Sequence, residues 1–447
     1  MKKLILILFF LISCSPDFSE LTFSDLTFIE NELKIIEILE GNDDDIVNKV
    51  VATNDGGFII VGNTKSTNGH YQIKEREGND IFLSKFNAEG IIEWMKIYGG
   101  SDDDIGNDVI ESLDGSFYII GYSKSNDGDA SFNKGQHDNW LIKTDFLGNL
   151  IWEKSYGFSG HDHAYNIIKT NDGGIFFNGF IDITASEGEG SSLRHGVGEF
   201  WCHKVNMNGE IIWRRFFGGS NNDRSYDAIE TLDGGFIIVG TSESQDFEIT
   251  NPNGSYDMWI VRISSNGELI WEKSIGGLAI DEGITILKTD DNNFMILGNT
   301  NSLKIEGTKN QGMNDYLFIK IDSDGNIIFK FRHGTQNFDY AKDMIQSKDG
   351  SYFVVGYSRN PENIQGVNLE NNSIFLSQAQ SNGVIQKTWT LSGANEDLGY
   401  SVCQLKNGKL VIVGSTESTD LDYSRVAHFE SESNSSNKDI FIAILNK

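Results

Sequence analysis

Short apolar runs, separated by turn residues, repeat along nearly the whole chain. The stretch that begins at residue 223 shows the pattern clearly. Apolar runs at 223–231, 236–240, 258–263 and 269–273 are separated by Asp233-Gly234-Gly235, a polar loop and Asn266-Gly267. Runs of this length, rich in β-branched and aromatic residues and bounded by turn residues, predict β-strands. We therefore expect four short strands in each repeating unit.

An aspartate followed by seventeen residues and a glycine marks each unit, and this spacing occurs seven times. The aspartates are Asp45, Asp104, Asp162, Asp223, Asp281, Asp339 and Asp397, and the glycines are Gly62, Gly121, Gly179, Gly240, Gly298, Gly356 and Gly414. Successive copies are 58 to 61 residues apart. So regular a period indicates one supersecondary unit copied seven times. Four antiparallel strands in each of seven copies predict an all-β fold, a seven-bladed β-propeller.

The marker residues are expected to serve the fold, because all seven copies share them. Each aspartate is expected to accept hydrogen bonds from backbone amides at a blade junction, as aspartate does in turns. The alternative is that the seven carboxylates surround the mouth of a central channel and hold a cation there.

Tight turns are expected between the first and second strands of each unit. Six copies have Asp or Asn followed by Gly at this point: Asp55-Gly56, Asp114-Gly115, Asp172-Gly173, Asp233-Gly234, Asp349-Gly350 and Asn407-Gly408. The fifth copy has Asp291-Asn292. Both residues of such pairs tolerate positive φ, which predicts two-residue type I′ hairpins.

The two ends of the chain are expected to share one blade. The last copy ends after its third strand, at 439–444, and residues 33–40 match the outermost strand of a unit. We therefore expect the N-terminal strand to close the seventh blade. Strict alternation along it would place Ile36 and Ile38 on one side and Ile35, Glu37 and Leu39 on the other.

The first fourteen residues have the features of a targeting signal. Lys2 and Lys3 precede nine consecutive apolar residues, which are too few to span a bilayer as a helix. The segment ends Leu11-Ile12-Ser13-Cys14. We therefore expect a signal peptide at 1–13, a tether that begins at Cys14 and covers 14–32, and the propeller at 33–447. An ordinary secretory signal with an incidental cysteine is the alternative.

Two family resemblances support these expectations. The residues that end at Cys14 resemble the lipobox of bacterial lipoproteins, which implies that this cysteine is lipidated and that Ser15 directs the protein to the outer membrane. The Gly-Gly-Ser-x-x-Asp motif at 99–104 and 218–223 resembles the propeller repeats of bacterial secreted proteins. A tryptophan in the outer strand, as at Trp94 and Trp271, is similar to kelch blades. These resemblances imply a fold and an anchor but no activity.

Composition limits the partners. The formal net charge is −29, from 65 acidic and 36 basic residues. A surface this acidic repels phosphate groups, so we expect neither nucleic acid nor anionic lipid as a ligand. The lipid on Cys14 would be the link to the membrane, and we expect a monomer. Cys202 and Cys403 lie in different copies and are expected to be buried free thiols.

Histidines are concentrated in the second and third copies. Five of the eight lie between 137 and 203. His137 and His195 belong to long loops, His161 and His163 flank the repeat aspartate of the third copy, and Glu199 follows nearby. Imidazole and carboxylate groups together suit zinc or another divalent ion. No compact metal-binding motif links these residues, so scattered surface histidines are the alternative. Apart from this cation, we expect no cofactor.

Two functions remain open on the sequence alone. The first is a lipid-anchored outer-membrane propeller, on the periplasmic or the surface side, that binds a protein or glycan ligand on its long-loop face or scaffolds a complex. The second is an extracytoplasmic hydrolase or lyase that acts on polysaccharide from the same face. The sequence contains no nucleophile elbow, phosphate-binding loop or identifiable catalytic carboxylate pair.

Overall fold

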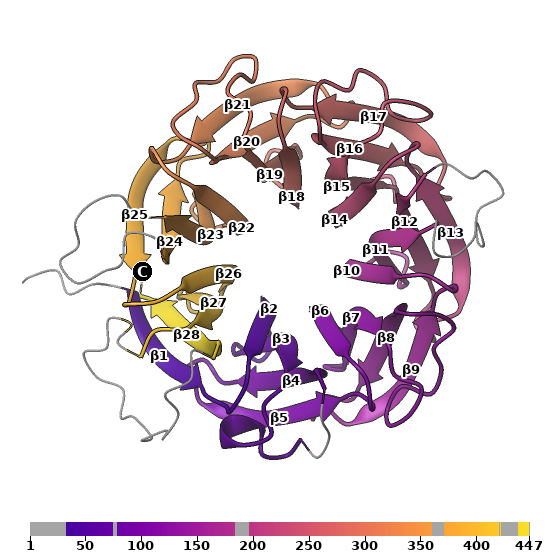
Figure 1. Ribbon diagram of the computed structural model, residues 1–447, viewed down its shortest axis with the longest axis vertical. Helices are drawn as coiled ribbons and strands as arrows, with labels where there is room; N and C mark the ends of the chain where they lie inside the picture. The colour runs from indigo at the N-terminus through magenta and orange to yellow at the C-terminus, as the bar shows by residue number, and fades with distance from the viewer. Residues whose placement is uncertain are drawn as a thin grey trace, which may run out of the picture.

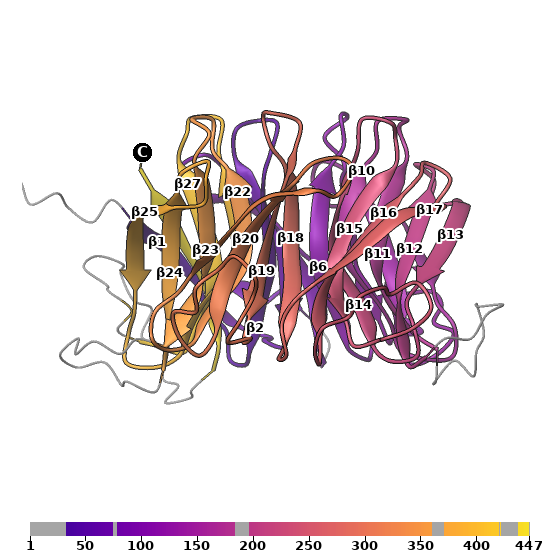
Figure 2. The ribbon, with the colours of Figure 1, turned by 90° about the horizontal axis from the view of Figure 1, so that it is seen from above.

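Seven four-stranded sheets surround one axis. The computed structural model describes residues 33–74, 78–183, 196–359, 371–419, 421 and 437–446. Within them every sheet is antiparallel, and the sheets follow one another around the ring as blades 1 to 7 (Figure 1). Seen from the side, the strands run between the two faces of the ring (Figure 2). The predicted all-β, seven-bladed propeller is confirmed.

Each blade contributes one strand to each of four concentric positions. The innermost strands are β2 (Asp45–Ala52), β6 (Asp104–Glu111), β10 (Asp162–Lys169), β14 (Asp223–Glu230), β18 (Asp281–Lys288), β22 (Asp339–Gln346) and β26 (Asp397–Gln404). The second strands are β3 (Phe58–Thr64), β7 (Phe117–Ser123), β11 (Ile175–Asp182), β15 (Phe236–Ser242), β19 (Phe294–Thr300), β23 (Tyr352–Arg359) and β27 (Leu410–Thr416). The third strands are β4 (Asp80–Phe86), β8 (Asp138–Thr144), β12 (Gly198–Val205), β16 (Asp257–Ile263), β20 (Asp315–Ile321), β24 (Asn372–Ala379) and β28 (Asp439–Leu445). The outer strands are β5 (Ile92–Tyr98), β9 (Leu150–Tyr156), β13 (Ile211–Phe217), β17 (Leu269–Ile275), β21 (Ile327–His333), β25 (Ile385–Leu391) and β1 (Leu33–Leu39).

The described residues contain one short helical turn, and it lies outside the blades. The 3-10 helix η1 (Gly69–Tyr71) lies between β3 and β4. No helix in this part of the chain has the length and apolar character needed to cross a membrane.

The N-terminal strand closes the ring, as predicted. β1 pairs antiparallel with β28 as the outer strand of blade 7. The predicted side-chain alternation is wrong, because a bulge between Ile35 and Glu37 leaves Ile36 without a paired partner. Ile35 therefore packs with Ile38 on one side of the sheet, and Ile36 packs with Leu39 on the other.

The turns between first and second strands differ from the predicted type. In blade 1 the Gly56 amide donates to the Thr53 carbonyl at 3.0 Å, and the Thr53 amide donates to the Gly57 carbonyl at 2.9 Å. Gly56 has φ of 99°, whereas Asp55 is not among the residues with positive φ. The turn is therefore type I with a glycine bulge, not type I′. The Asp55 carboxylate caps it by accepting the Gly57 amide at 3.0 Å, a contact that the type I′ prediction did not consider.

Close backbone approach explains the repeat glycine. A Cβ on Gly121 would lie 1.8 Å from the Ile105 carbonyl oxygen, and the other six repeat glycines face the corresponding oxygen of their inner strands at 1.8–2.3 Å. Any side chain there would push the first and second strands of the blade apart. The Cys202 and Cys403 side chains are buried and form no disulfide.

Hydrogen bonds connect inner strands of different blades at the residue four positions after each repeat aspartate. In blades 2, 4 and 6 this residue is an aspartate that accepts bonds from the next blade. The bonds run from Asn166 and Ile167 to Asp108, from Thr285 and Ile286 to Asp227, and from Ser401 and Val402 to Asp343, at 2.5–3.2 Å. Blade 1 carries Lys49 instead, whose ammonium donates to both oxygens of Asp343 at 3.1 Å. Burial opposes a charge on Lys49, but the three nearby carboxylates raise its pKa above the usual value.

Candidate metal centre

The backbone brings two predicted histidines together where blade 2 meets blade 3. His137, just before β8, forms a parallel bridge with His161, just before β10. The Asp162 amide donates to the His137 carbonyl at 2.8 Å and fixes this pairing. Equivalent amide bonds occur at other junctions, for example from Asp281 to Tyr256 at 2.8 Å. The position of the two histidines is therefore a property of the repeat, and only the side chains are particular to this junction.

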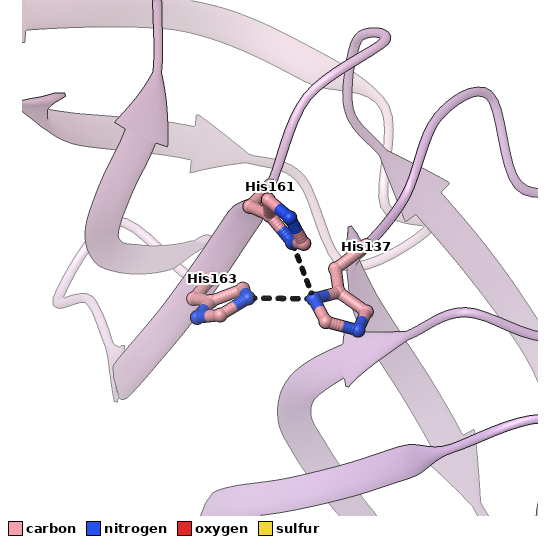
Figure 3. A group of neighbouring side chains, drawn as sticks. All are labelled: His137, His161 and His163. Carbon is pink, nitrogen blue, oxygen red and sulfur yellow. Dashed lines mark hydrogen bonds between the residues drawn. The ribbon is translucent and has the colours of Figure 1, made fainter. Parts of the chain in front are cut away.

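Three imidazoles converge at this junction (Figure 3). His137 Nδ1 lies 2.8 Å from His161 Nδ1 and 2.9 Å from His163 Nε2. One nitrogen from each ring falls within a group no wider than 4.8 Å, and all three side chains are half-buried. Nitrogens in a tetrahedral zinc site, with bonds of about 2.0–2.1 Å, are about 3.3 Å apart. Small side-chain rotations would therefore bring the three rings into position around one divalent ion.

The electrostatics of the cluster keep two of the rings neutral. Burial, together with the neighbouring His161, lowers the pKa of His137 to about 4. Burial likewise lowers the pKa of His163 to about 3, helped by His137 and His161. Imidazole must be deprotonated to bind a metal. These rings are thus in the ligand form at neutral pH.

Aromatic side chains hold His163 in place. Tyr122 stacks on its ring with centroids 3.9 Å apart, and Phe180 meets it edge-on at 5.1 Å. The Tyr165 hydroxyl lies 3.4 Å from His163 Nδ1, the nitrogen that faces away from the cluster. A partner on the distal nitrogen fixes the tautomer and orientation of a metal-binding histidine. Tyr165 is in the right place for that role.

Glu199, a predicted ligand that the structure describes, does not belong to this group. His195 lies outside the described residues. Glu199 is fully buried in β12, in the register position where other third strands carry an aspartate. Those aspartates are Asp80, Asp138, Asp257, Asp315 and Asp439. Glu199 is therefore part of the repeat framework, and its nearness in sequence to His195 was a misleading signal.

The seven repeat aspartates are buried at the blade junctions. In six of them a carboxylate oxygen accepts the amide of the residue four positions earlier, at 2.5–2.8 Å. Asp45 accepts instead from the hydroxyls of Thr64 and Ser66. These contacts connect each inner strand to its own blade junction and leave the carboxylates directed toward the protein.

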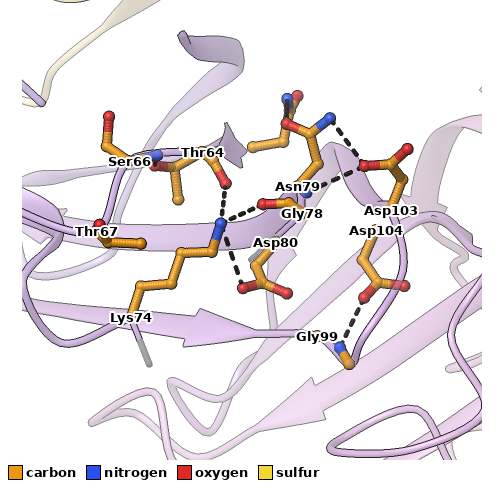
Figure 4. Close-up of polar contacts among 12 residues, drawn as sticks. Thr64, Ser66, Thr67, Lys74, Gly78, Asn79, Asp80, Gly99, Asp103 and Asp104 are labelled. Atoms are coloured by element: carbon orange, nitrogen blue, oxygen red, sulfur yellow. Dashed lines mark hydrogen bonds and ion pairs between the residues drawn. The ribbon is translucent and has the colours of Figure 1, made fainter. Parts of the chain in front are cut away.

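The junction of blades 1 and 2 has the same backbone but a different chemistry (Figure 4). Asn79 and Asp103 occupy the positions of His137 and His161. The Asn79 backbone and side-chain amides both donate to Asp103 Oδ1, at 3.1 and 3.2 Å. Asn79 also accepts a hydrogen bond from Asn63 at 3.2 Å, so this junction carries an amide–carboxylate network where the next carries imidazoles.

Several residues beside the cluster were not identified from the sequence. Tyr122, Tyr165, Phe180 and Arg224 surround His163 and occupy positions that differ from blade to blade. Aligning the seven copies and marking the positions without a shared residue would have selected them. Tyr165 is two residues from His163 on β10, whereas Tyr122 and Phe180 reach His163 from β7 and β11, so spacing alone does not select these two.

Comparisons with known proteins give only distant similarities. No protein-family model and no curated protein matches the chain. Among solved structures it is similar to a virginiamycin B lyase from Staphylococcus aureus, with 13% identity, a TM-score of 0.48, and 92% of this chain and 99% of that one covered. It is also similar to BamB from Moraxella catarrhalis, with 12% identity, a TM-score of 0.41 and the same coverage. An ulvan lyase matches with 10% identity and a TM-score of 0.49 over 85% of this chain and 93% of that one. Similarity at this level does not extend to ligands or activity.

Proposed function

We propose that this chain is a lipid-anchored propeller of the bacterial outer membrane that binds its ligand on the long-loop face through a divalent metal ion. Zinc is the ion that a set of imidazole ligands suits well. His137, His161 and His163 hold it, and Tyr165 positions His163. The ligand-binding role is preferred over a purely structural one because the metal site lies on one junction among seven.

The convergence of three imidazole nitrogens within 4.8 Å carries this proposal. A fold-stabilising contact would be expected to recur around the ring, as the repeat aspartates do. Here one junction departs from the repeat with three histidines at once. Three protein ligands also leave a fourth position of a tetrahedral ion open, which is the arrangement that zinc sites use when they bind something else.

The test of the metal site is its metal content. Purified protein should hold about one equivalent of zinc by elemental analysis, in keeping with a single site. His161→Asn should lose it, whereas His333→Asn should keep it, because His333 is a half-buried histidine of blade 5 outside the cluster. Wild-type protein that takes up no zinc in a calorimetric titration would remove the proposal.

The anchor is tested separately. Cys14→Ser protein should leave the membrane fraction, since several acyl chains hold a protein firmly and none would remain. Surface proteolysis of intact cells would then tell the periplasmic from the external side. If Cys14→Ser protein fractionates with membranes like the wild type, the lipoprotein assignment is wrong.

An enzymatic role is the second candidate, and the same ligand set favours it. Catalytic zinc sites also have three protein ligands and one open position. A zinc-dependent loss of polysaccharide viscosity that His161→Asn abolishes would identify a hydrolase or lyase. Binding without turnover would identify the module that we propose.

A further inference from the structure

Arg224 is an arginine without an ionic partner beside the metal centre. It follows the repeat aspartate of blade 4, and its side chain is exposed. Its guanidinium carbon lies 4.7 Å from the centroid of Phe180. Among the described residues the Arg224 side chain forms no hydrogen bond or ion pair, although the chain has 65 acidic residues against 36 basic ones. Carboxylates are thus abundant, yet none neutralises this charge.

The buried lysine and arginine side chains differ from Arg224, because each has a carboxylate partner. The pairs are Lys74 with Asp80, Lys85 with Glu93, Lys204 with Asp172, Arg262 with Asp233, Lys320 with Asp291 and Arg332 with Asp315. Lys342 has no such pair but lies over the Tyr340 ring, 4.9 Å from its centroid. Lys124 also lies near His137 but pairs with Asp102 at 3.3 Å, so Arg224 is the exposed cation beside the histidines that lacks a carboxylate partner among the described residues.

Phe180 connects Arg224 to the metal centre. The same ring that carries the guanidinium meets the edge of His163 at 5.1 Å. Tyr165 stacks parallel to Phe180 at 6.5 Å and contacts Tyr226 at 5.7 Å. The His163 imidazole and the Arg224 guanidinium therefore contact one group of aromatic side chains from β10, β11 and β14.

The charge of the centre selects the ligand. Three neutral imidazoles leave a bound divalent ion with its full positive charge, and no carboxylate of the described residues joins the three-histidine group. An anionic oxygen is then the favoured fourth ligand. A guanidinium binds a carboxylate with two parallel hydrogen bonds.

We propose that the three-histidine centre binds an anionic ligand that carries at least one carboxylate, with one oxygen donor on the metal ion and a carboxylate on Arg224. This inference rests on the proposed metal site and names the class of ligand for it. Dicarboxylates and sugar acids have the required pair of groups. An uncharged saccharide lacks the carboxylate and should not be retained.

The experiment uses protein loaded with cobalt(II) in place of zinc, with free metal removed by gel filtration. Visible absorption is recorded while glutarate, D-glucuronate or D-glucose is added. We expect the two acids to change the cobalt spectrum and D-glucose to leave it unchanged. Arg224→Gln should bind the same amount of cobalt but bind the acids at least about 10-fold more weakly, because hydrogen bonds to charged groups are worth that much.

Arg215→Gln is the matched control. Arg215 lies on β13, the outer strand of blade 3, and pairs with Glu268 at 3.3 Å. The Arg215→Gln protein should bind the acids like the wild type. Unchanged affinity in Arg224→Gln, or a cobalt spectrum that neither acid alters in the wild type, would overturn the anionic-ligand inference while leaving the metal site intact. Failure to bind cobalt at all would overturn both proposals.

Discussion

Two neighbouring blade junctions share one backbone and differ in what they can bind. At the junction of blades 1 and 2, the Asn79 amides donate to the Asp103 carboxylate (Figure 4). At the junction of blades 2 and 3, His137 and His161 occupy the same positions, and His163 adds a third ring (Figure 3). Each imidazole ring can offer one nitrogen lone pair to a metal ion.

The difference shows how a repeat protein acquires a site. The repeat fixes where the residues before the third and first strands lie, through the amide bond from Asp162 to His137 at one junction and from Asp104 to Asn79 at the other. Side-chain replacement then changes the chemistry without moving the backbone. Function on such a scaffold should be sought where one copy departs from the others.

Deleting the strand that closes the ring should have the largest effect, because it lowers the stability of the whole propeller, including both junctions. Deleting residues 33–40 removes β1, and with it three buried side chains, Leu33, Ile38 and Leu39. Each is worth about 1.5–3 kcal/mol when fully buried. Their sum is a large part of a typical stability of about 5–15 kcal/mol. We expect the deletion to lower the free energy of unfolding by several kcal/mol in urea titrations. A deletion mutant that stays monomeric and unfolds at the wild-type urea concentration would show that β1 does not hold the ring.

Moving the histidines to the neighbouring junction should create a second site. Asn79→His, Asp103→His and Ile105→His together reproduce the three positions in blades 1 and 2. Because the backbone is the same, we expect the triple variant to bind two equivalents of zinc where the wild type binds one. Isothermal titration measures this directly. A triple variant that folds normally but binds a single equivalent would mean that the aromatic surroundings of His163 are also required.

Removing the hydroxyl behind His163 should weaken the site without destroying it. Tyr165→Phe deletes the group 3.4 Å from His163 Nδ1. Loss of such a supporting contact typically costs about 10–100-fold in metal affinity. Competition with a chelator should therefore show weaker zinc binding, whereas Tyr400→Phe, the equivalent position in blade 7, should bind zinc like the wild type. Equal affinity in the two variants would remove Tyr165 from the site.

The smallest effect should come from the repeat aspartate of blade 1, Asp45. Burial raises the pKa of Asp45 to about 7 despite hydrogen bonds from Thr64 and Ser66. An unfolded aspartate has a pKa of about 3.9. The folded protein therefore binds more protons than the unfolded chain between these values, so this contribution to stability is present at low pH and lost as pH rises through 7.

Melting temperatures of metal-free protein should consequently fall between pH 5.5 and 8. Asp45→Asn cannot titrate, so its melting temperature should fall by a few degrees less than that of the wild type over this range. Parallel pH curves for the two proteins would show that Asp45 does not titrate between pH 5.5 and 8.

The blades and their closure could be predicted because they depend on spacing. The seven aspartates and glycines gave the period, and the missing fourth strand of the last copy pointed to residues 33–40. Local geometry was less accessible. Type I and type I′ turns both accept Asp-Gly, and the capping bond to the Gly57 amide that favours one of them is visible only in three dimensions. The bulge at Ile36 likewise could not be predicted, because no residue type in this strand indicates where a bulge occurs.

Three of the five candidate ligands lie together in the structure. His137, His161 and His163 could be grouped because loops of adjacent blades meet on one face. Glu199 was grouped with them through nearness in sequence, although it occupies the framework position shared with Asp138 and its counterparts. Tyr122 and Phe180 could not be predicted as partners of His163, because they lie on other strands.

The hydrogen bonds between inner strands distinguish blade 1 from the other six blades. Bonds from blade 3 to blade 2, from blade 5 to blade 4, and from blade 7 to blade 6 each end on an aspartate. In blade 1 the Val50 amide donates instead to the Ser401 hydroxyl of blade 7, and the Lys49 ammonium reaches Asp343 of blade 6. A ring of similar units thereby has one blade whose inner strand contacts both of the blades that precede it around the ring.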